Sequence, residues 1–89
     1  MKIKLELFGA SRDFSNEDHL ELEVQDKASI NDLKNVIIKY LNKNFTRNES
    51  FIKIVKSSAF CSENNEIISD NYKITKDQKI GIIPPIGGG

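Results

Sequence analysis

The stretch "KIKLELF" (residues 2–8) decides the fold, because its side chains alternate between apolar and charged until the last position. Ile3, Leu5 and Leu7 share one face, while two lysines and a glutamate share the other. A period of two residues is typical of a strand with one buried face. Phe8 falls on the polar face and departs from the pattern. The chain therefore begins with a half-buried strand that carries one apolar residue on its outer side.

A second strand follows after a polar connection. The stretch "HLELEV" (19–24) alternates again, with its two leucines and its valine on one face. The connection "GASRDFSNED" (9–18) is rich in turn residues and has room for one helical turn around residues 12–14. Two strands joined by a loop of this length indicate an antiparallel hairpin.

The next segment predicts an amphipathic helix. In "QDKASINDLKNVIIKYLNKN" (25–44), Ser29 and Asp32 have the spacing of a capping box, with aspartate in place of the usual glutamate. The apolar residues that follow recur at helical spacing, at Ile30, Leu33, Ile37, Tyr40 and Leu41. This apolar stripe of about three turns needs a sheet to cover, and the hairpin supplies one.

The middle of the chain leaves two interpretations open. Residues 43–57 form either a loop followed by a strand or a loop followed by a short helix, because their apolar residues fit neither period cleanly. The stretches "AFCS" (59–62) and "EIIS" (66–69) then predict a short hairpin around Asn64 and Asn65.

The last strand is predicted at "KIGII" (79–83), with Ile80 and Ile82 inward, after a polar turn at residues 76–78. Pro84 has no amide hydrogen to donate, so it ends the strand. The order of elements predicts an α+β fold in residues 1–83, with one mixed sheet and one main helix packed across one face. We expect the first and last strands to lie side by side in the middle of the sheet.

The composition narrows the possible functions. The chain has 89 residues, with 13 basic and 13 acidic side chains and a net charge of zero, which argues against a nucleic-acid partner. It contains no apolar run long enough for a membrane span and no signal peptide, so we expect a cytoplasmic protein. A single Cys61 and a single His19 are too few for a metal site of these ligands. We expect Cys61 to be a packing residue, His19 to be exposed and the chain alone to be no enzyme, with no bound cofactor.

The tail "PPIGGG" (84–89) has almost no side chains to bury. Successive prolines favour a stiff, extended arm, and glycines can thread a channel too narrow for other residues. Gly89 carries an ionised α-carboxylate, which another protein must activate before acyl chemistry. A frayed terminus or a cloning remnant is the alternative, although a flexible linker would more often carry serine. We assign the threading role to Pro84, Pro85, Ile86, Gly87 and Gly88.

The stretch "KIGIIPPIGGG" (79–89) resembles the C-terminus of molybdopterin synthase small subunits, the MoaD type of the ThiS/MoaD sulfur carriers. That family ends in a short apolar strand, Pro-Pro, an apolar residue and Gly-Gly. The opening strand with its Arg-containing turn, the capped helix and the "NNEIIS" hairpin fall in the family's order. Residues 43–57 are longer and more polar than in the family, Gly87 is an extra glycine, and Asp77-Gln78 replaces the usual glycine of the last turn.

The resemblance implies a ubiquitin-like β-grasp fold with a flexible C-terminal tail, and a sulfur carrier. A ubiquitin-activating-type enzyme would use ATP to adenylate the carboxylate of Gly89, and a persulfide-bearing sulfur donor would convert it to a thiocarboxylate. The tail would then enter the large subunit of molybdopterin synthase, in a heterotetramer of two small and two large subunits. There it would give its sulfur to cyclic pyranopterin monophosphate, with the catalytic side chains supplied by the large subunit.

Three outward apolar residues, Phe8, Ile67 and Ile83, are candidates for a docking patch that both partners share. A scattered apolar surface without function is the alternative. Other clients also stay open, namely thiamine-thiazole synthesis, tRNA thiolation and protein modification, and so does an interaction module with an inert tail. Extension or deletion of Gly89 separates carriers from a docking module, because only a carrier needs the free terminal carboxylate.

Overall fold

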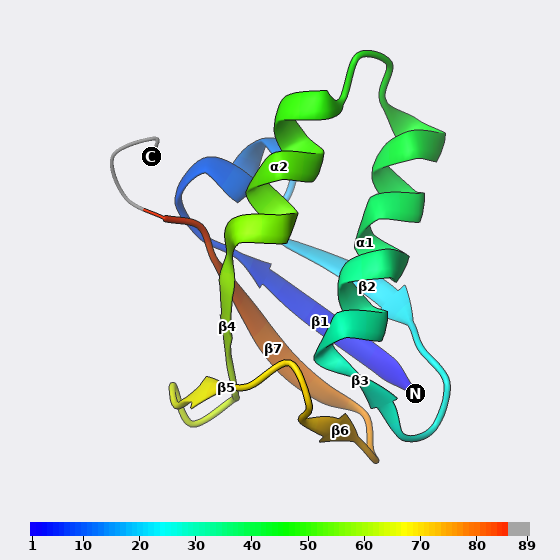
Figure 1. Ribbon diagram of the computed structural model, residues 1–89, viewed down its shortest axis with the longest axis vertical. Coiled ribbons are helices and arrows are strands. Elements are labelled where there is room, and N and C mark those ends of the chain that lie inside the picture. The colour runs from blue at the N-terminus through cyan, green and yellow to red at the C-terminus, as the bar shows by residue number, and fades with distance from the viewer. Residues whose placement is uncertain (86–89) are drawn as a thin grey trace.

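The computed structural model describes residues 1–85, and residues 86–89 lie outside the described part. Five strands form one mixed sheet in the order β2-β1-β7-β4-β5, and two helices cover one of its faces (Figure 1). The elements are β1 (Lys2–Leu7), η1 (Gly9–Phe14), β2 (His19–Glu23), β3 (Ala28–Ser29), α1 (Ile30–Asn44), α2 (Glu49–Ser57), β4 (Ala59–Cys61), β5 (Ile67–Ile68), β6 (Lys73–Ile74) and β7 (Gln78–Ile83).

The strand pairing confirms the predicted layout. β1 and β2 pair in antiparallel fashion and form the predicted hairpin. β1 pairs in parallel with β7, so the first and last strands lie side by side in the middle of the sheet. β4 joins the other side of β7 and pairs with β5 around the predicted turn at Asn64 and Asn65. The α+β architecture with a mixed sheet and one main helix is thus confirmed.

The core lies between the inner face of the sheet and α1. Leu5 of β1 and Ile80 of β7 are fully buried and are direct partners across the parallel strands. α1 presents the predicted apolar stripe, of which Ile30, Leu33, Ile37 and Leu41 are fully buried. Because each buried aliphatic side chain is worth ~1.5–3 kcal/mol relative to exposure, this layer is the main source of stability.

The capping box at the start of α1 is present as predicted. The Asp32 amide donates to Ser29 Oγ at 3.1 Å, and the Ser29 amide donates to Asp32 Oδ2 at 2.9 Å. These backbone and side-chain hydrogen bonds with Ser29 hold the pKa of Asp32 below its usual range. The box fixes where the helix begins and therefore how its apolar face meets the sheet.

The segment that the sequence left open forms a loop followed by the helix α2, so the helical interpretation is confirmed. Phe51, Ile54 and Val55 have the spacing of neighbours on one helical face. The Phe51 ring lies 5.0 Å from the Phe14 ring and 5.3 Å from the Phe45 ring, between ring centres. Burial of these aromatic rings against η1 and the end of α1 selects the helix over a strand.

Two features of the fold were not predicted. β3 and β6 form a separate two-stranded sheet, which is too short to leave a periodic signal. The turn expected at residues 76–78 is also one residue too long, because Gln78 begins β7. Its buried side chain accepts a hydrogen bond from Tyr72 Oη at 3.0 Å and donates to the Lys76 carbonyl at 3.1 Å, which explains how a polar residue enters the strand. Within residues 1–85, no helix has the length and apolar character needed to cross a membrane.

Candidate functional site

The central strand β7 leads directly into the C-terminal residues. Ile80 and Ile82 are fully buried beneath the helices. Ile82 is paired with Leu7 of β1 on one side and with Phe60 of β4 on the other. The chain is therefore held by the sheet on both sides almost to the end of the strand, and it leaves the body at a fixed point.

The two prolines that follow β7 have different surroundings. Pro84 is buried, whereas Pro85 is exposed. The Pro84 ring faces Gly9, the first residue of η1, and a Cβ atom built on Gly9 would lie 3.9 Å from Pro84 Cδ. The first proline is therefore packed into the body. The remaining predicted tail residues, Ile86 to Gly89, lie outside the described residues.

The turn η1 keeps the chain next to Pro84 in a tight conformation. Gly9 has a φ of 55°, in the left-handed region that favours glycine. Ser11 is fully buried, and its hydroxyl donates to the Phe8 carbonyl at 2.7 Å, while its amide donates to the same carbonyl at 3.2 Å. These bonds close the turn directly after β1, so β1 ends before β7 does.

A row of apolar residues crosses the outer face of the sheet near this point. Gly81 of β7 is the direct partner of Cys61 in β4, and Cys61 is the direct partner of Ile67 in β5. Phe8, at the end of β1, lies against Gly81 from the other side. We call the residues Phe8, Gly81, Cys61, Ile67 and Ile83 the apolar strip. Phe8 is 44% exposed and Ile67 is 67% exposed, so both ends of the row are open to solvent.

Gly81 is the residue that lets the strip form. A Cβ atom at this position would lie 2.7 Å from Cys61 Sγ and 2.9 Å from Phe8 Cε2. Both distances are shorter than side chains tolerate, so any other residue would push the Phe8 ring or the Cys61 side chain away. The edge of the Phe8 ring therefore occupies the space next to a strand position that has no side chain of its own.

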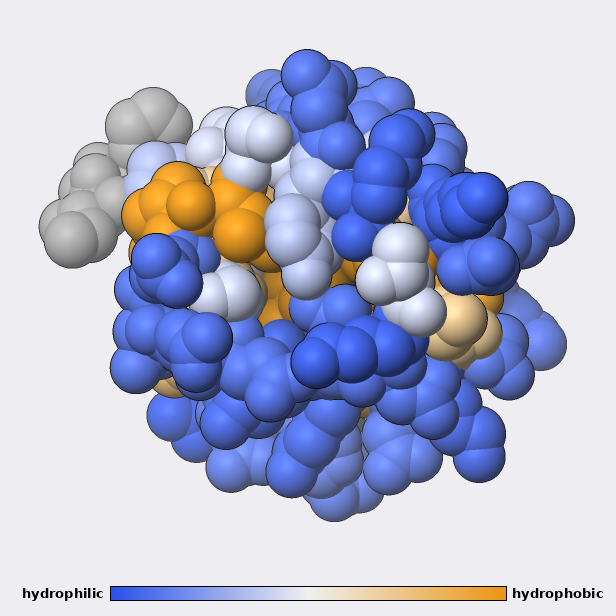
Figure 2. All heavy atoms as spheres, turned by 90° about the horizontal axis from the view of Figure 1, so that it is seen from below, coloured by the Kyte–Doolittle hydropathy of each residue, from blue (hydrophilic) through white to orange (hydrophobic). Residues whose placement is uncertain are grey.

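Most large apolar side chains of the described residues lie in the core, and few are exposed at the surface. Figure 2 shows a largely hydrophilic face with hydrophobic atoms gathered mainly in one area towards the left of the view. Among the described residues, Phe8 and Ile67 are the large apolar side chains classed as exposed, and both belong to the strip. A compact apolar area on an otherwise polar surface is typical of a site for protein contact.

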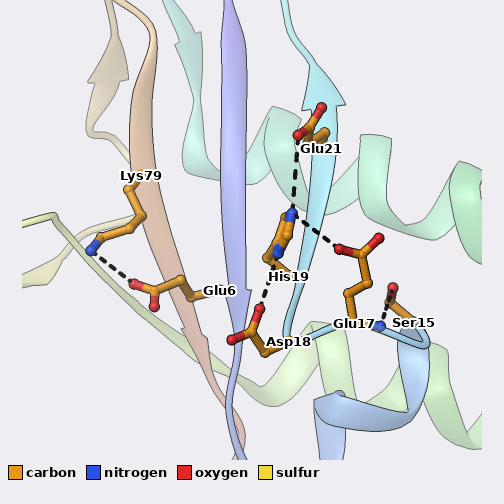
Figure 3. Close-up of polar contacts among 7 residues, drawn as sticks. All are labelled: Glu6, Ser15, Glu17, Asp18, His19, Glu21 and Lys79. Atoms are coloured by element: carbon orange, nitrogen blue, oxygen red, sulfur yellow. Dashed lines mark hydrogen bonds and ion pairs between the residues drawn. The ribbon is translucent and has the colours of Figure 1, made fainter.

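The other half of the outer face is charged (Figure 3). Lys79 Nζ lies 3.3 Å from Glu6 Oε1, in an ion pair that joins β7 to β1. His19, at the start of β2, has its Nδ1 atom 3.0 Å from Asp18 Oδ1, and its side chain is 20% exposed, so the histidine that we expected to be exposed is half-buried. The hydrogen bond from His19 holds the pKa of Asp18 below its usual range.

The two side chains considered for nucleophilic chemistry are far apart. His19 lies on β2 and Cys61 on β4, with β1 and β7 between them. Three strand spacings correspond to about 14 Å, which is too far for a thiol and its base. Cys61 is buried, as expected of a packing residue. The described part of the chain also contains no group of three or more metal-ligating side chains suited to hold an ion.

The structure brings the predicted docking residues to one face and adds two more. Phe8 and Ile67 are exposed, whereas Ile83, the partner of Ala59 in β4, is half-buried. Gly81 and Cys61 complete the row between Phe8 and Ile67. That these four residues are neighbours was not predicted from the sequence. A glycine inside the alternating stretch "KIGII" was the available signal, since glycine within a strand often marks close packing.

Comparisons with known proteins agree on the fold. The chain matches no protein-family model, and no curated sequence is similar enough to count as a match. Among solved structures, it is similar to a putative molybdopterin converting factor subunit 1 from Pyrococcus furiosus, with a TM-score of 0.69 and 20% identity over 96% of this chain and 98% of that one. It is also similar to SAMP1 from Haloferax volcanii, with a TM-score of 0.68 and 14% identity over 100% of both chains.

A third similar structure is the ubiquitin of Caldiarchaeum subterraneum, with a TM-score of 0.60 and 17% identity over 100% of this chain and 98% of that one. The chain therefore has the ubiquitin-like β-grasp fold over its whole described length. At these levels of identity, the likeness establishes the architecture alone.

Proposed function

We propose that the protein is a sulfur carrier whose reacting group is the α-carboxylate of Gly89. The observation that carries this proposal is the point at which the C-terminal tail begins. The buried central strand β7 runs directly into the Pro-Pro pair, beside an apolar strip on an otherwise polar surface. Such an arrangement holds the body against a partner while the last residues reach into that partner's active site. The β-grasp fold shared with a putative molybdopterin converting factor subunit supports the same assignment.

The chemistry at Gly89 would take place in three steps: adenylation, transfer of sulfur from a persulfide, and release from the donor. A carboxylate oxygen attacks the α-phosphorus of ATP in an adenylating partner, pyrophosphate leaves, and an acyl-adenylate forms. The terminal sulfur of a persulfide donor then attacks the acyl carbon and AMP leaves. A second thiol of the donor cleaves the resulting acyl disulfide, which leaves a thiocarboxylate on the chain and a disulfide on the donor. A thiocarboxylate sulfur is an anionic nucleophile, so the loaded chain needs no catalytic side chain of its own.

We further propose that the client is molybdopterin synthesis. The loaded tail would enter the large subunit of molybdopterin synthase and transfer its sulfur to cyclic pyranopterin monophosphate. The support is the "IIPPIGGG" ending and the structural similarity to the putative molybdopterin converting factor subunit 1 from Pyrococcus furiosus. Two large and two small subunits would form the synthase, and ATP would be consumed only earlier, by the separate adenylating enzyme.

The apolar strip is the proposed docking surface for both partners. Phe8 and Ile67 stand at its two ends with much of their surface exposed. Burial of such side chains is worth ~1.5–3 kcal/mol each, which suits a carrier that must bind and release two partners in turn. The ion pairs on the neighbouring half of the face leave a polar rim around the contact.

Intact mass spectrometry tests the proposal. The protein is co-expressed with a candidate adenylating enzyme and its sulfur donor, purified and weighed beside a matched chain that carries one alanine after Gly89. The native chain should gain the mass of one sulfur in place of one oxygen, and the extended chain should gain nothing. Loading of both chains, or of neither with every candidate enzyme tried, would contradict the proposal.

A second candidate function is protein modification, because the similar structures include a ubiquitin, SAMP1 and a small archaeal modifier protein 1. The activation step would be the same, but the acyl group would pass to a lysine amine of a target protein. The products separate the two functions: conjugates that resist reducing agents indicate a modifier, whereas a free thiocarboxylate indicates a sulfur carrier.

A further inference from the structure

The end of β1 and the end of β7 are shaped to fit each other. β1 stops at Leu7, the partner of Ile82, while β7 continues to Ile83. Beyond that point the chain of β1 turns into η1, and the Phe8 carbonyl is taken by two hydrogen bonds from Ser11. Pro84 follows β7 into the space beside this turn. Because proline has no amide hydrogen, it can be buried there without a ladder partner.

Gly9 lies beside the Pro84 ring, on the side where a side chain at position 9 would point. Its φ of 55° requires a residue that tolerates the left-handed region. A Cβ built on Gly9 would meet Pro84 Cδ at 3.9 Å and Pro84 Cγ at 4.0 Å, which are ordinary van der Waals distances. Position 9 therefore favours glycine because of its backbone conformation and not because of a clash with Pro84. The Pro84 ring lies beside this turn.

Two consecutive residues, Phe8 and Gly9, lie beside β7 and the residue that follows it. Phe8 is next to Gly81 on the outer face, and Gly9 is beside Pro84, directly after the end of the strand. The segment Phe8–Gly9 thus lies between the exposed end of the apolar strip and Pro84, the first residue of the tail. A partner that binds the Phe8 ring would at the same time meet the tail root in a fixed position.

We propose that Gly9 and Pro84 are positioning residues that set the direction in which the C-terminal arm leaves the body. This inference rests on the proposed carrier function. The arm that enters a partner begins at Pro85, which is exposed, while Pro84 belongs to the folded body. Fixing the root reduces the number of directions that the arm must search before its carboxylate reaches the activating site, so the contact should act on the rate of loading after docking.

The two prolines supply a matched pair of variants, Pro84→Ala and Pro85→Ala. Each removes one ring from the same short segment, but only Pro84 is buried against Gly9. Loading is measured with the adenylating enzyme that gives the sulfur-for-oxygen mass gain, as kcat and KM with the carrier as the varied substrate. We expect Pro84→Ala to lower kcat about tenfold with little change in KM, and Pro85→Ala to lower it clearly less. Equal losses for both variants, or a loss that appears only in KM, would overturn the proposal.

A second measurement needs no partner and therefore separates this inference from the proposed function. In the isolated protein, a nuclear Overhauser cross-peak between Gly9 Hα and Pro84 Hδ should be present, and the amide signals of η1 should shift in Pro84→Ala more than in Pro85→Ala. Absence of the cross-peak in the native protein would overturn the inference even if loading occurs. A native chain that shows the cross-peak but is never loaded would overturn the carrier function instead.

Discussion

The two halves of the outer sheet face have opposite characters. Over β2 and β1, outward positions are charged, and ion pairs such as Glu6 with Lys79 join neighbouring strands. Over the end of β7 and over β4 and β5, the outward positions are glycine, cysteine and isoleucine, with the Phe8 ring lying across them. The charged half follows the alternation that a solvent-facing sheet requires, whereas the apolar half breaks it. The apolar half contains the strip that we propose as the docking surface. It lies at the same end of the sheet as Pro84, where the C-terminal tail begins.

The largest effect is expected from Gly81→Val, which breaks the apolar half directly. The new side chain would collide with Cys61 Sγ and with the Phe8 ring, which stand 2.7 Å and 2.9 Å from the position of its Cβ. We expect a loss of about 1–3 kcal/mol in the free energy of unfolding, because the site is overpacked, and a loss of detectable docking to the adenylating enzyme. Urea denaturation and titration calorimetry measure the two quantities. Lys79→Val, on the same strand and face, is the matched control: it should keep native docking and lose only the Glu6 ion pair, which is worth about 0.2–1 kcal/mol in the free energy of unfolding.

Phe8→Ala should weaken docking but leave the fold intact. The ring is 44% exposed and packs over a glycine, so its removal opens no internal cavity. We expect affinity for the adenylating enzyme to fall about tenfold, in proportion to the apolar area lost from the interface. The midpoint of urea denaturation should stay close to that of the native protein. A cooperative unfolding transition that disappears in this variant would show that Phe8 belongs to the core.

Removal of the Glu6–Lys79 ion pair should have a small effect on stability and none on docking. Both side chains are partly exposed, at 36% and 45%, so water screens their attraction. Glu6→Gln is therefore expected to cost about 0.2–1 kcal/mol in the free energy of unfolding. The same calorimetric titration should give the native affinity. If Glu6→Gln lowered the affinity as much as Phe8→Ala does, the docking surface would include the charged half of the face, which would contradict this prediction.

The smallest effect concerns the pH dependence of the charged half. The hydrogen bond from His19 lowers the pKa of Asp18, so this carboxylate stabilises the folded state above its unfolded pKa. That contribution is lost as the pH falls through the lowered folded-state pKa. Asp18→Asn should therefore be slightly less stable than the native protein at neutral pH, and the difference should vanish in strong acid. Thermal denaturation of both proteins from neutral pH to strong acid measures this difference in stability. A difference that grows as the pH falls would contradict the prediction.

The sequence predicted the parts of the fold that depend on local periodicity. Alternation in β1 and β2, the helical stripe of α1 and its capping box at Ser29 all leave signals within a few neighbouring residues. The helix α2 could not be chosen over a strand, because its aromatic packing involves Phe14 and the end of α1, which are distant in the chain. The strands β3 and β6 are two residues each, too short for any period.

The candidate site was predicted only in part, for a similar reason. Phe8 and Ile67 stood out as apolar residues in outward positions, but their connection through Gly81 and Cys61 depends on the register of four strands. Pro84 is buried beside the left-handed turn at Gly9, which lies 75 positions earlier in the chain. Such contacts become visible only when the strands are paired.

The most direct test of the account is fragmentation of the loaded protein in the mass spectrometer, which locates the added sulfur along the chain. The account predicts that one oxygen is replaced by sulfur and that the change appears only in C-terminal fragments that contain Gly89. An added sulfur atom found instead on fragments that contain Cys61 would mean that the thiol carries the sulfur as a persulfide. That result would contradict the claim that the folded body holds the partner while the terminal carboxylate does the chemistry.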